Sequence, residues 1–540
     1  MAKFTRTNAW SNGGTFDNKD LYWYAIGVGA MMNRALDDPA SWWFFAAIHG
    51  EYVTPESLRN PRVHAWSKIP GPPTVPTSPL PAKPTYDKFW NQCQHGSWYF
   101  LPWHRGYLMA LEAQIREEIA PLGGPSTWSL PYWNYFGPDS QFDIPPAFTL
   151  PTLPNGSPNP LLLTARYGPL DSADQTNIWV ATDAGIRNHP PIPPVLFQGP
   201  VTLDSMSDTI YPGDVLVPEF GGPRTGFHHS NGKHGDLETN PHDLVHVYVG
   251  GTSPDGSFPG LMSVPALAGL DPIFYLHHAN IDRLWAVWNV TLGNPNPAEP
   301  KWLDGPAVGG NQEFIMPWPG TGQWTYTPRD MGDFAPLNYT YDDLSGPGGA
   351  VSMIAQRLAN LGSISTTAEA TMSASVPEGN NIELVGASLS PLTVQGTGAQ
   401  TTVRLQPAVR SQLAVSLANA TVSSPPDRVF LNLEDVRGTR DAQVLSVFID
   451  LPPNAKPAEH PELLAGSVAL FGLVDASFDS GEHGGQGLNF ALDISRVIDK
   501  LHLENKLDND SLEVTIVPNK VVADRDQITI GKISILRKGR

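Results

Sequence analysis

Hydrophobic and polar positions follow two different patterns along the chain. From Asn8 to about Leu344, apolar residues recur with helical spacing, as in Leu21–Met32, and long Pro/Gly-rich loops such as 69–84 separate these stretches. Beyond residue 400, short runs alternate between apolar and polar residues. Helical spacing predicts helices packed on a core, and alternation predicts strands buried on one face. The alternating runs are Arg428–Leu433, Val444–Leu451, Ser467–Val474, Leu512–Val517 and Ile528–Ile535, with one helix expected at about Ala491–Leu501.

These patterns predict two domains. Residues 1–345 are expected to form a mainly α, loop-rich helical bundle, and residues 401–540 a β-rich domain, either a sandwich or a barrel. Residues 346–400 are rich in Gly, Ser, Thr and Pro, which predicts a linker, with a short helical pattern around Val351–Leu361. A chain of 540 residues is too long for one ordinary core. The alternative is that the C-terminal strands continue the core of the first domain.

Composition and charge exclude several classes of partner. A formal net charge of -19 repels phosphate backbones and anionic lipid surfaces, so we expect neither nucleic acid nor membrane binding. No apolar run approaches the length that spans a bilayer. Acidic residues precede Leu21–Met32, which identifies this stretch as a core helix and not a signal peptide. The single cysteine allows no intrachain disulfide and favours a reducing compartment, so we expect a cytoplasmic protein; the oligomeric state is not indicated.

Three histidines in the first 110 residues have positions that suit metal ligands. His49 closes an apolar run and is followed by Gly50, a helix-stop signal. Pro102 can open a helix whose apolar face continues to Ile119, which places His104 in its first turn. His95 lies shortly before that helix.

A second group of histidines lies further along the chain. His242 and His246 are four residues apart, so on a helix their side chains share one face. The predicted helix 271–285 carries His277 and His278, and His278 shares a face with Asp282, which could orient an imidazole from behind. Periodicity alone leaves His277 open as the ligand.

Two groups of three imidazoles indicate a binuclear metal site. Imidazole binds zinc, copper, iron and nickel, but structural zinc sites usually include thiolates and di-iron bundles use carboxylates. Neither pattern surrounds these histidines. Two copper ions, with dioxygen as co-substrate, are therefore the favoured interpretation.

The residues around these histidines resemble those of the type-3 copper proteins, which are tyrosinases, catechol oxidases and haemocyanins. The resemblance is carried by Ala46–Gly50, Cys93-Gln-His95 with His104-Arg105, Glu238-Thr-Asn-Pro-His242 with His246, and Asp271-Pro-x-Phe-x-x-His-His278-x-x-x-Asp282-Arg-x-Trp285. It implies the copper ligands His49, His95, His104, His242, His246 and His278, since the second histidine of the pair is the ligand in the family. It extends over about residues 3–345, where Tyr339 and Tyr341 resemble the tyrosine pair that ends the catalytic domain and Arg6 its arginine partner.

The resemblance also assigns residues around the metal ligands. Cys93 corresponds to a cysteine that fungal and molluscan members join to the second histidine by a thioether, here His95; the alternative is a buried free thiol. Glu238 corresponds to a glutamate that holds a water near the coppers. Asp243 stands where tyrosinases commonly carry Asn. It either acts as a base for a monophenol or repels the phenolate, and the sequence does not decide between these effects.

The entrance to the site differs from that of many plant enzymes. Those enzymes place a gating Phe thirteen residues before the last histidine, where this chain has Pro265 next to Val264. This predicts an open entrance, unless the loop aligns differently. Four histidines outside the triplets are expected to be solvated loop residues and receive no role: His228, His229, His234 and His483.

The resemblance implies a polyphenol oxidase that acts on small phenols, oxidising o-diphenols to o-quinones and, depending on Asp243, hydroxylating monophenols. An o-aminophenol oxidase and a haemocyanin-like oxygen carrier are the alternatives, because the same ligands bind dioxygen when substrates cannot reach it. A zinc hydrolase is a third, weaker alternative. The C-terminal domain resembles that of latent polyphenol oxidases, which suggests a lid over the copper entrance, with Phe471 or Phe478 as the plug, although aromatic residues at such positions more often belong to a core.

Overall fold

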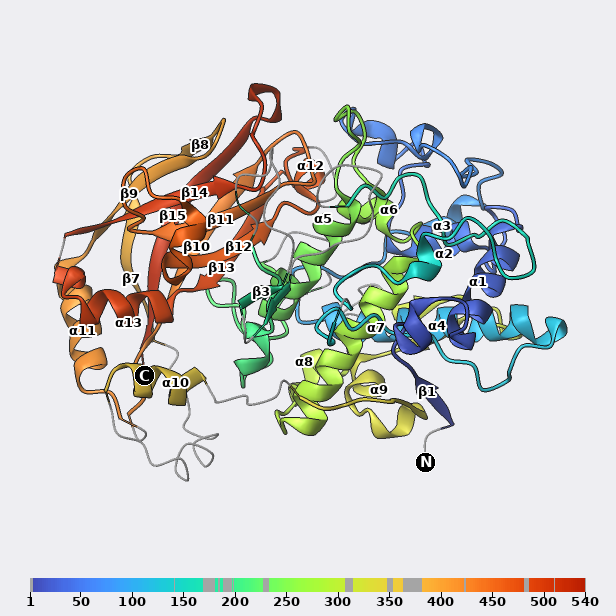
Figure 1. Ribbon diagram of the computed structural model, residues 1–540, viewed down its shortest axis with the longest axis horizontal. Helices are drawn as coiled ribbons and strands as arrows, with labels where there is room; N and C mark the ends of the chain where they lie inside the picture. Colours follow the sequence, from blue (N-terminus) through green and yellow to red (C-terminus); the bar gives the residue numbers. More distant parts are fainter. Residues whose placement is uncertain are drawn as a thin grey trace.

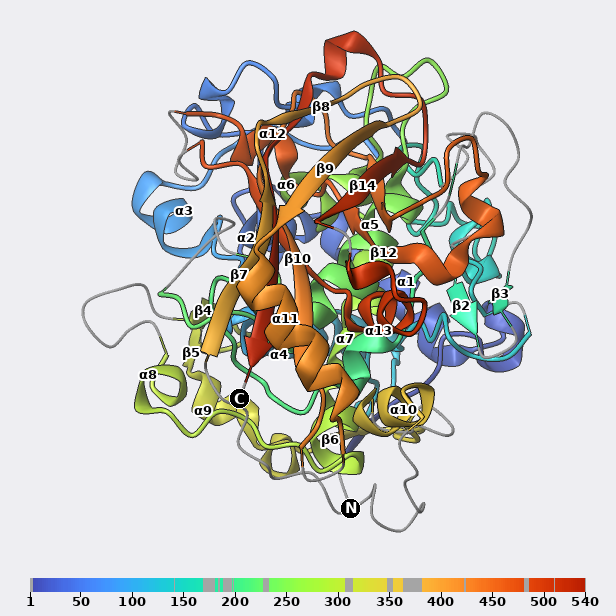
Figure 2. The same cartoon turned by 90° about the vertical axis from the view of Figure 1, so that its left-hand side faces the viewer.

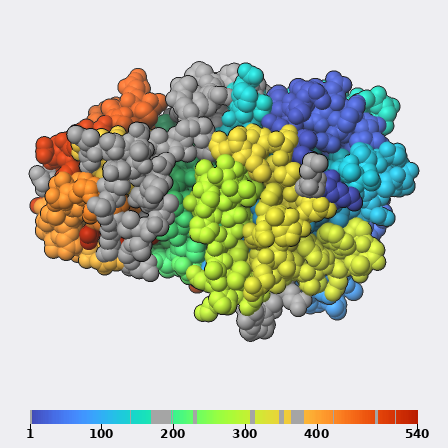
Figure 3. All heavy atoms as spheres, turned by 90° about the horizontal axis from the view of Figure 1, so that it is seen from below, coloured from blue at the N-terminus to red at the C-terminus, as the bar shows by residue number. Residues whose placement is uncertain are grey.

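The computed structural model describes residues 3–139, 141–168, 180–182, 185–187, 197, 199–226, 233–305, 314–346, 353–362, 381–421, 424–479, 485–508 and 510–539. Figure 1 shows a helical region on the right and a β-sheet region on the left, and the space-filling view of Figure 3 places them at opposite ends of the long axis. In the described residues, none of the helices has the length and apolar character needed to cross a membrane.

The helical region is organised around α4 (Phe100–Ile119) and α7 (Ile273–Ala286), with every α7 residue buried. Helix α1 (Lys19–Met32) begins where the Asn18 side chain accepts hydrogen bonds from the backbone of the first turn. A Cβ added at Gly27 of α1 would lie 2.7 Å from Cγ2 of Ile115 in α4, so glycine permits this close helix approach. The other helices of this region are α2 (Trp42–His49), α3 (Lys83–Phe89), α5 (Leu244–Gly250), α6 (Pro265–Ala268), α8 (Pro300–Leu303) and α9 (Pro328–Gly332).

Short strands tie the ends of the helical region together. Strand β1 (Phe4–Arg6) pairs in parallel with β6 (Tyr339–Tyr341), which sets Arg6 opposite Tyr341. Two further antiparallel pairs are β2 (Val180–Thr182) with β3 (Gly185–Arg187) and β4 (Phe314–Met316) with β5 (Trp324–Tyr326). The helical region is therefore closed, by the pairing of β1 with β6, before residue 346.

The C-terminal region forms a nine-stranded sheet that nearly closes into a barrel, in the order β12-β11-β14-β9-β7-β15-β10-β13, with β8 beside β15. The two end strands meet, since a Cβ added at Gly466 in β12 would lie 2.9 Å from Cδ2 of Leu492 in β13. The strands are β7 (Asn381–Ser388), β8 (Leu392–Val394), β9 (Ala399–Leu405), β10 (Arg428–Arg437), β11 (Val444–Ile449), β12 (Leu464–Ala469), β13 (Leu488–Asp493), β14 (Ser511–Pro518) and β15 (Ile528–Gly539). The predicted β domain of the sandwich or barrel class is confirmed.

Helices α11 (Pro407–Ala418) and α13 (Ser495–Leu503) lie in front of this sheet in Figure 2. The sheet has its own hydrophobic cluster, which includes Leu417 of α11 and Leu501 of α13, so it does not simply continue the first core. Helix α10 (Met353–Asn360) lies where the sequence predicts a helical pattern. Its Arg357 donates two hydrogen bonds of 2.7 Å to Asp499 of α13, which attaches α10 to the C-terminal domain.

Three predicted boundaries differ from the structure. Strands β7 and β8 lie within 346–400, the range assigned to the linker, so the sheet begins before residue 401. Ala491 belongs to β13, and the predicted helix begins only at Ser495, because pairing with β10 continues the strand through Asp493. The run Ser467–Val474 leaves the sheet after Ala469 and turns into α12 (Leu473–Ala476).

Candidate metal centre

Six buried histidines converge from five helical segments and one loop of the helical region. His49 ends α2, His95 precedes α4, and His104 lies on α4. His242 lies on the short π-helical segment η7 (Glu238–Asp243), His246 on α5 and His278 on α7. Within the first group Nε2 of His49 is 3.4 Å from Nε2 of His95, and in the second group Nε2 of His278 is 3.3 Å from Nε2 of both His242 and His246. The rings of His104 and His278 stack at 4.4 Å, which brings the two triplets together.

The outer ring nitrogen of most of these histidines is held by an oxygen. Nδ1 of His49, His104 and His246 lies 2.7–2.9 Å from the backbone carbonyls of Pro265, Phe100 and Met262 respectively. Nδ1 of His95 and His242 lies 2.7 and 2.9 Å from the carboxylates of Glu238 and Asp243. Metal-binding histidines typically donate their second N–H to such acceptors, which fixes the tautomer and leaves Nε2 for the metal.

Burial favours the neutral form of four of these imidazoles, those of His104, His242, His246 and His278. It lowers the pKa of His104 to about 3. It also lowers the pKa values of His242, His246 and His278 well below the usual value, and the imidazoles around these three add to the effect. A metal ligand must be deprotonated, so this set is poised to bind a cation. Two buried all-nitrogen triplets that face each other fit a pair of copper ions.

Both members of the His277-His278 pair lie near the second group. The side chains of His242, His246, His277 and His278 offer ligand atoms within 4.8 Å of one another. Among the described residues only His278 has an Nε2 at 3.3 Å from Nε2 of both His242 and His246; the ring of His277 lies 5.3 and 5.0 Å from those two rings, but neither of its nitrogens has a hydrogen-bond partner. This arrangement favours His278.

Cys93 is buried beside the first triplet. Its Sγ lies 3.6 Å from Nε2 of His104 and belongs to the same close group as His49 and His95. Burial raises the pKa of the thiol well above its usual value. The thioether to His95 stays a prediction.

His234, a histidine outside the two triplets, lies between Asp243 and Glu238 and contacts both. His234, expected to be a solvated loop residue, is buried: its Nδ1 lies 2.6 Å from Oδ2 of Asp243 and its Nε2 3.8 Å from Oε1 of Glu238. Although burial opposes its charge, the two carboxylates raise the pKa of His234 to about 9. His228, His229 and His483 lie outside the described residues.

Neither of these carboxylates is free. Asp243 receives one imidazole on each oxygen, from His234 and His242. Glu238 accepts from His95 and from the backbone N–H of Gly96 at 3.1 Å. Both side chains therefore orient groups around the imidazoles instead of facing an open space as free bases.

Asp282 does not orient an imidazole, contrary to the prediction from periodicity. Its oxygens accept hydrogen bonds from Arg6 at 2.9 Å, Arg105 at 2.5 Å, and the Tyr339 and Tyr341 hydroxyls at 2.6 Å. Two guanidinium groups outcompete a neutral imidazole for a buried carboxylate, and they lower its pKa despite burial. Arg6 also donates to the Tyr341 hydroxyl, which confirms the predicted partnership.

The C-terminal domain covers the imidazoles with one aromatic side chain. The ring of Phe471, in the turn before α12, stacks on His246 at 4.4 Å and lies 5.8 Å from His95 and 6.1 Å from His242. Phe471 is 2% exposed and belongs to the hydrophobic cluster of the helical region. Phe478 is only half-buried and shows no such contact in the described residues.

The predicted entrance residues lie beneath the same turn. Val264 is buried, and the ring of Pro265 packs near Gly472, where an added Cβ would lie 3.2 Å from its Cγ. Asp475 of α12 accepts hydrogen bonds from the Tyr52 hydroxyl and, at 3.2 Å, from the Asn60 amide. Polar bonds thus anchor the turn beside the aromatic contact, and the entrance at Pro265 is covered, not open.

Comparisons with known proteins agree with this arrangement. The model of the common central domain of tyrosinase matches residues 39–291, and a domain of unknown function (DUF7868) matches residues 381–538. A tyrosinase from Hahella sp. (strain CCB-MM4) is 30% identical over 531 residues, covering 95% of this chain and 96% of that protein. Chloroplastic polyphenol oxidase A1 of Vicia faba is 29% identical over 259 residues, covering 47% of this chain and 38% of the plant protein.

A solved structure shows the same two-part fold. A recombinantly expressed latent aurone synthase (polyphenol oxidase) superposes with a TM-score of 0.59 at 19% identity, covering 100% of this chain and 91% of that one. The fold common to both is a helical domain followed by a C-terminal β domain.

Proposed function

Because the chain belongs to the tyrosinase family, and is thus a type-3 copper phenol oxidase of the polyphenol oxidase class, we propose that it oxidises o-diphenols to o-quinones with dioxygen. Two molecules of diphenol give up four hydrogen atoms to one dioxygen, which yields two quinones and two waters. The observation that supports this proposal most directly is the pair of buried imidazole triplets facing each other.

In this proposal His49, His95 and His104 hold one copper ion, and His242, His246 and His278 hold the other. The copper pair, when bound, supplies dioxygen binding and two-electron oxidation. The chain's own contribution is to keep the imidazoles neutral and correctly oriented, through the carbonyls and carboxylates at their outer nitrogens.

Hydroxylation of monophenols is proposed to be slow. A monophenol must lose its proton before oxygen transfer, which requires a base that can reach the phenol. Asp243 and Glu238 both have their oxygens engaged by imidazoles or backbone N–H groups. Asp243 then acts as a positioning residue for His242, while His234 compensates its charge.

We propose that the C-terminal domain keeps the enzyme latent. Phe471 lies against three of the proposed ligands, so no ring of similar size can occupy that place while the domain is docked. Arg428 supports docking through ion pairs to Asp208 at 3.2 Å and Glu219 at 2.6 Å of the catalytic domain.

The test is oxygen uptake by copper-loaded protein with 4-methylcatechol, tyramine and o-aminophenol, before and after removal of the C-terminal domain. A protease recognition sequence should be inserted between residues 346 and 353, because α10 belongs to the C-terminal domain. We expect diphenol oxidation to rise on cleavage and to exceed tyramine oxidation.

Three results would contradict the proposal. Absence of quinone both before and after cleavage would indicate an oxygen carrier, and faster turnover of o-aminophenol than of 4-methylcatechol would favour the aminophenol oxidase. Unchanged diphenol oxidation after complete release of the domain would reject the lid.

A further inference from the structure

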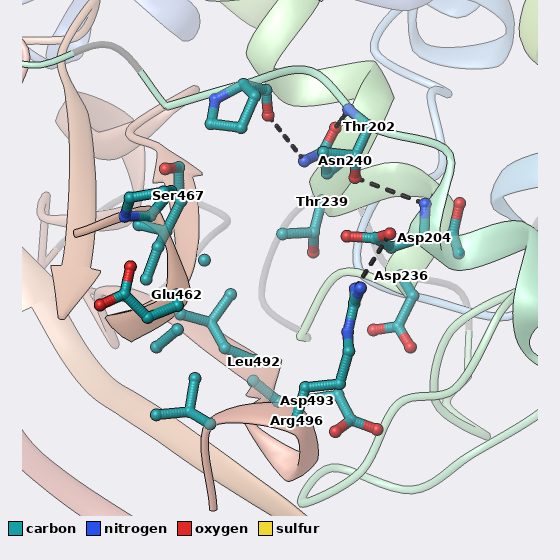
Figure 4. A pocket seen from close by; sticks show the side chains of 18 of the residues that line it. Thr202, Asp204, Asp236, Thr239, Asn240, Glu462, Ser467, Leu492, Asp493 and Arg496 are labelled. Atoms are coloured by element: carbon teal, nitrogen blue, oxygen red, sulfur yellow. Dashed lines mark hydrogen bonds and ion pairs between the residues drawn. The ribbon is translucent and has the colours of Figure 1, made fainter. Parts of the chain in front are cut away.

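A cavity of about 490 Å³ lies between the two domains, and none of the six histidines of the triplets lines it. One wall comes from the catalytic domain and includes Asp204, Asp236 and Thr239; the other comes from the C-terminal domain and includes Glu462 and Leu492 (Figure 4). Pockets of this size typically enclose a small organic molecule.

The walls combine an apolar surface with an excess of carboxylates. The apolar part is formed mainly by the C-terminal domain, with Leu464, Ala465, Leu492 and Val497. Two of the acidic residues are neutralised across or along the cavity: Asp204 pairs with Arg496 at 3.1 Å, and Glu462 pairs with Lys500 at 3.3 Å.

Asp236 is different from these acidic residues. Among the described residues no basic side chain forms an ion pair with it; burial raises the pKa of its carboxyl group to about 6, while a hydrogen bond with Asp208 and the more distant charge of Arg428 lower it. Asp208 forms an ion pair with Arg428, whose guanidinium also pairs with Glu219 and Asp493. Burial and the neighbouring Asp236 carboxyl raise the pKa of Asp208 well above its usual value, although the Arg428 guanidinium opposes this shift.

Two hydroxyl groups at the same place lack partners. Thr239 and Ser205 line the cavity, are 4% and 5% exposed, and have no hydrogen-bond partner for their hydroxyl oxygens among the described residues. Buried hydroxyls are normally hydrogen-bonded, so these two hydroxyls are available to bind a ligand in the cavity.

We propose that this cavity binds a small organic ammonium ion, with the ammonium group at Asp236, Asp208 and the Thr239 hydroxyl. An ammonium group has three N–H donors, which match two carboxyl groups and one hydroxyl. A cation between the Asp208 and Asp236 carboxyl groups offsets the repulsion between them. The apolar wall favours an organic body over a bare metal ion.

The ligand also links the two domains, a consequence that rests on the proposed lid. Since its site has walls from both domains, it binds the docked form and stabilises docking. Thr239 follows Glu238 in η7, and that segment also carries His242, so the ligand contacts the backbone that supports the copper site. Occupancy is therefore expected to prolong latency.

Binding should be measured by calorimetry on the full-length, copper-loaded protein, with benzylammonium as the probe and benzyl alcohol and benzoate as neutral and anionic controls. We expect saturable binding of benzylammonium only, weakened at least tenfold in Asp236→Asn and in Thr239→Val. The matched control is Asp87→Asn, an exposed carboxylate on α3 that does not line the cavity and should leave binding unchanged.

The outcomes distinguish the proposed binding site from the proposed lid. Absence of binding, equal binding of benzyl alcohol, or unchanged affinity in both cavity variants would overturn the site, whatever proteolysis does to activity. Binding that disappears in the variants supports the site even if cleavage between residues 346 and 353 fails to activate the enzyme. If both hold, saturating benzylammonium should slow proteolytic activation of the parent and leave Asp236→Asn unaffected.

Discussion

The contact between Phe471 and the imidazoles gives a direct test of latency through the substitution Phe471→Ala. The Phe471 ring is 2% exposed and stacks on His246 at 4.4 Å, so truncation removes a fully buried aromatic side chain from a packed site. Buried Phe→Ala substitutions cost about 3–5 kcal/mol. Because Phe471 packs mainly in the cluster of the opposite domain, most of this loss falls on docking and not on the fold of either domain.

The expected rise in activity can be worked out from this loss of docking free energy. About 3 kcal/mol raises the ratio of undocked to docked molecules about 100-fold, since about 1.4 kcal/mol corresponds to a factor of ten. The substitution also vacates the space over His95, His242 and His246 in molecules that stay docked. Both effects increase substrate access, and the rise ends when the rate equals that of the cleaved enzyme.

The assay is the initial rate of 4-methylcatechol oxidation by uncleaved protein, normalised to copper content and to the rate after cleavage. Phe478→Ala is the matched control, because Phe478 is half-buried, close in sequence and makes no ring contact with the described imidazoles. A Phe471→Ala protein that binds two coppers, keeps the parent's circular dichroism and is still as inactive as the parent would refute this reasoning.

Four further predictions concern the site and its supports. Asp243→Asn leaves one acceptor oxygen for two imidazole N–H donors and should weaken copper retention at His242 by about 10- to 100-fold in competition with a chelator; unchanged retention would contradict the positioning role. Cys93 and His95 lie on one tryptic peptide, 89–105, which a thioether should make lighter by two hydrogen atoms and unable to take up a thiol-alkylating reagent; a peptide of full mass with alkylated Cys93 would exclude the thioether. Burial raises the pKa of Asp441 to about 8, so the folded protein retains a proton that the unfolded chain releases near pH 4. The contribution of Asp441 to stability therefore falls as the pH rises from about 4 to 8. Asp441→Asn should flatten this fall in Tm values measured across the pH range, and equal slopes in parent and variant would contradict the prediction. Removal of copper by a chelator should lower the Tm and re-addition restore it, because the ions bind only the folded state; equal Tm values with and without copper would count against a site of this strength.

Local signals in the sequence identify most of the site's components. The apolar run before His49 is a property of one helix, α2, and the four-residue spacing of His242 and His246 spans the junction of η7 with α5. The structure brings His242 and His246 into one close group of side chains. The burial of His234 is not predictable from the sequence, because this residue lies in no periodic segment. Its buried position depends on contacts with Asp243 and Glu238, which belong to η7.

The same distinction holds for the fold. Alternation located five of the nine strands of the C-terminal sheet, β10, β11, β12, β14 and β15. The end of β13 depends on pairing with β10, a contact between distant residues that local propensity does not encode. The contacts of Asp282, in the helical domain, also depend on residues that are distant in the sequence. Its helical face is predictable from sequence, but its partners Arg6 and Arg105 come from β1 and α4.

The position of Phe471 also bears on the order in which the molecule is made. Synthesis proceeds from the N-terminus and domains generally fold as units, so the catalytic half, closed by the pairing of β1 with β6, is complete before Phe471 leaves the ribosome. During that interval the imidazoles are still uncovered by the turn that carries Phe471. We therefore expect copper loading to be fastest on nascent or freshly released chains, and the docked domain to retain metal that has already entered.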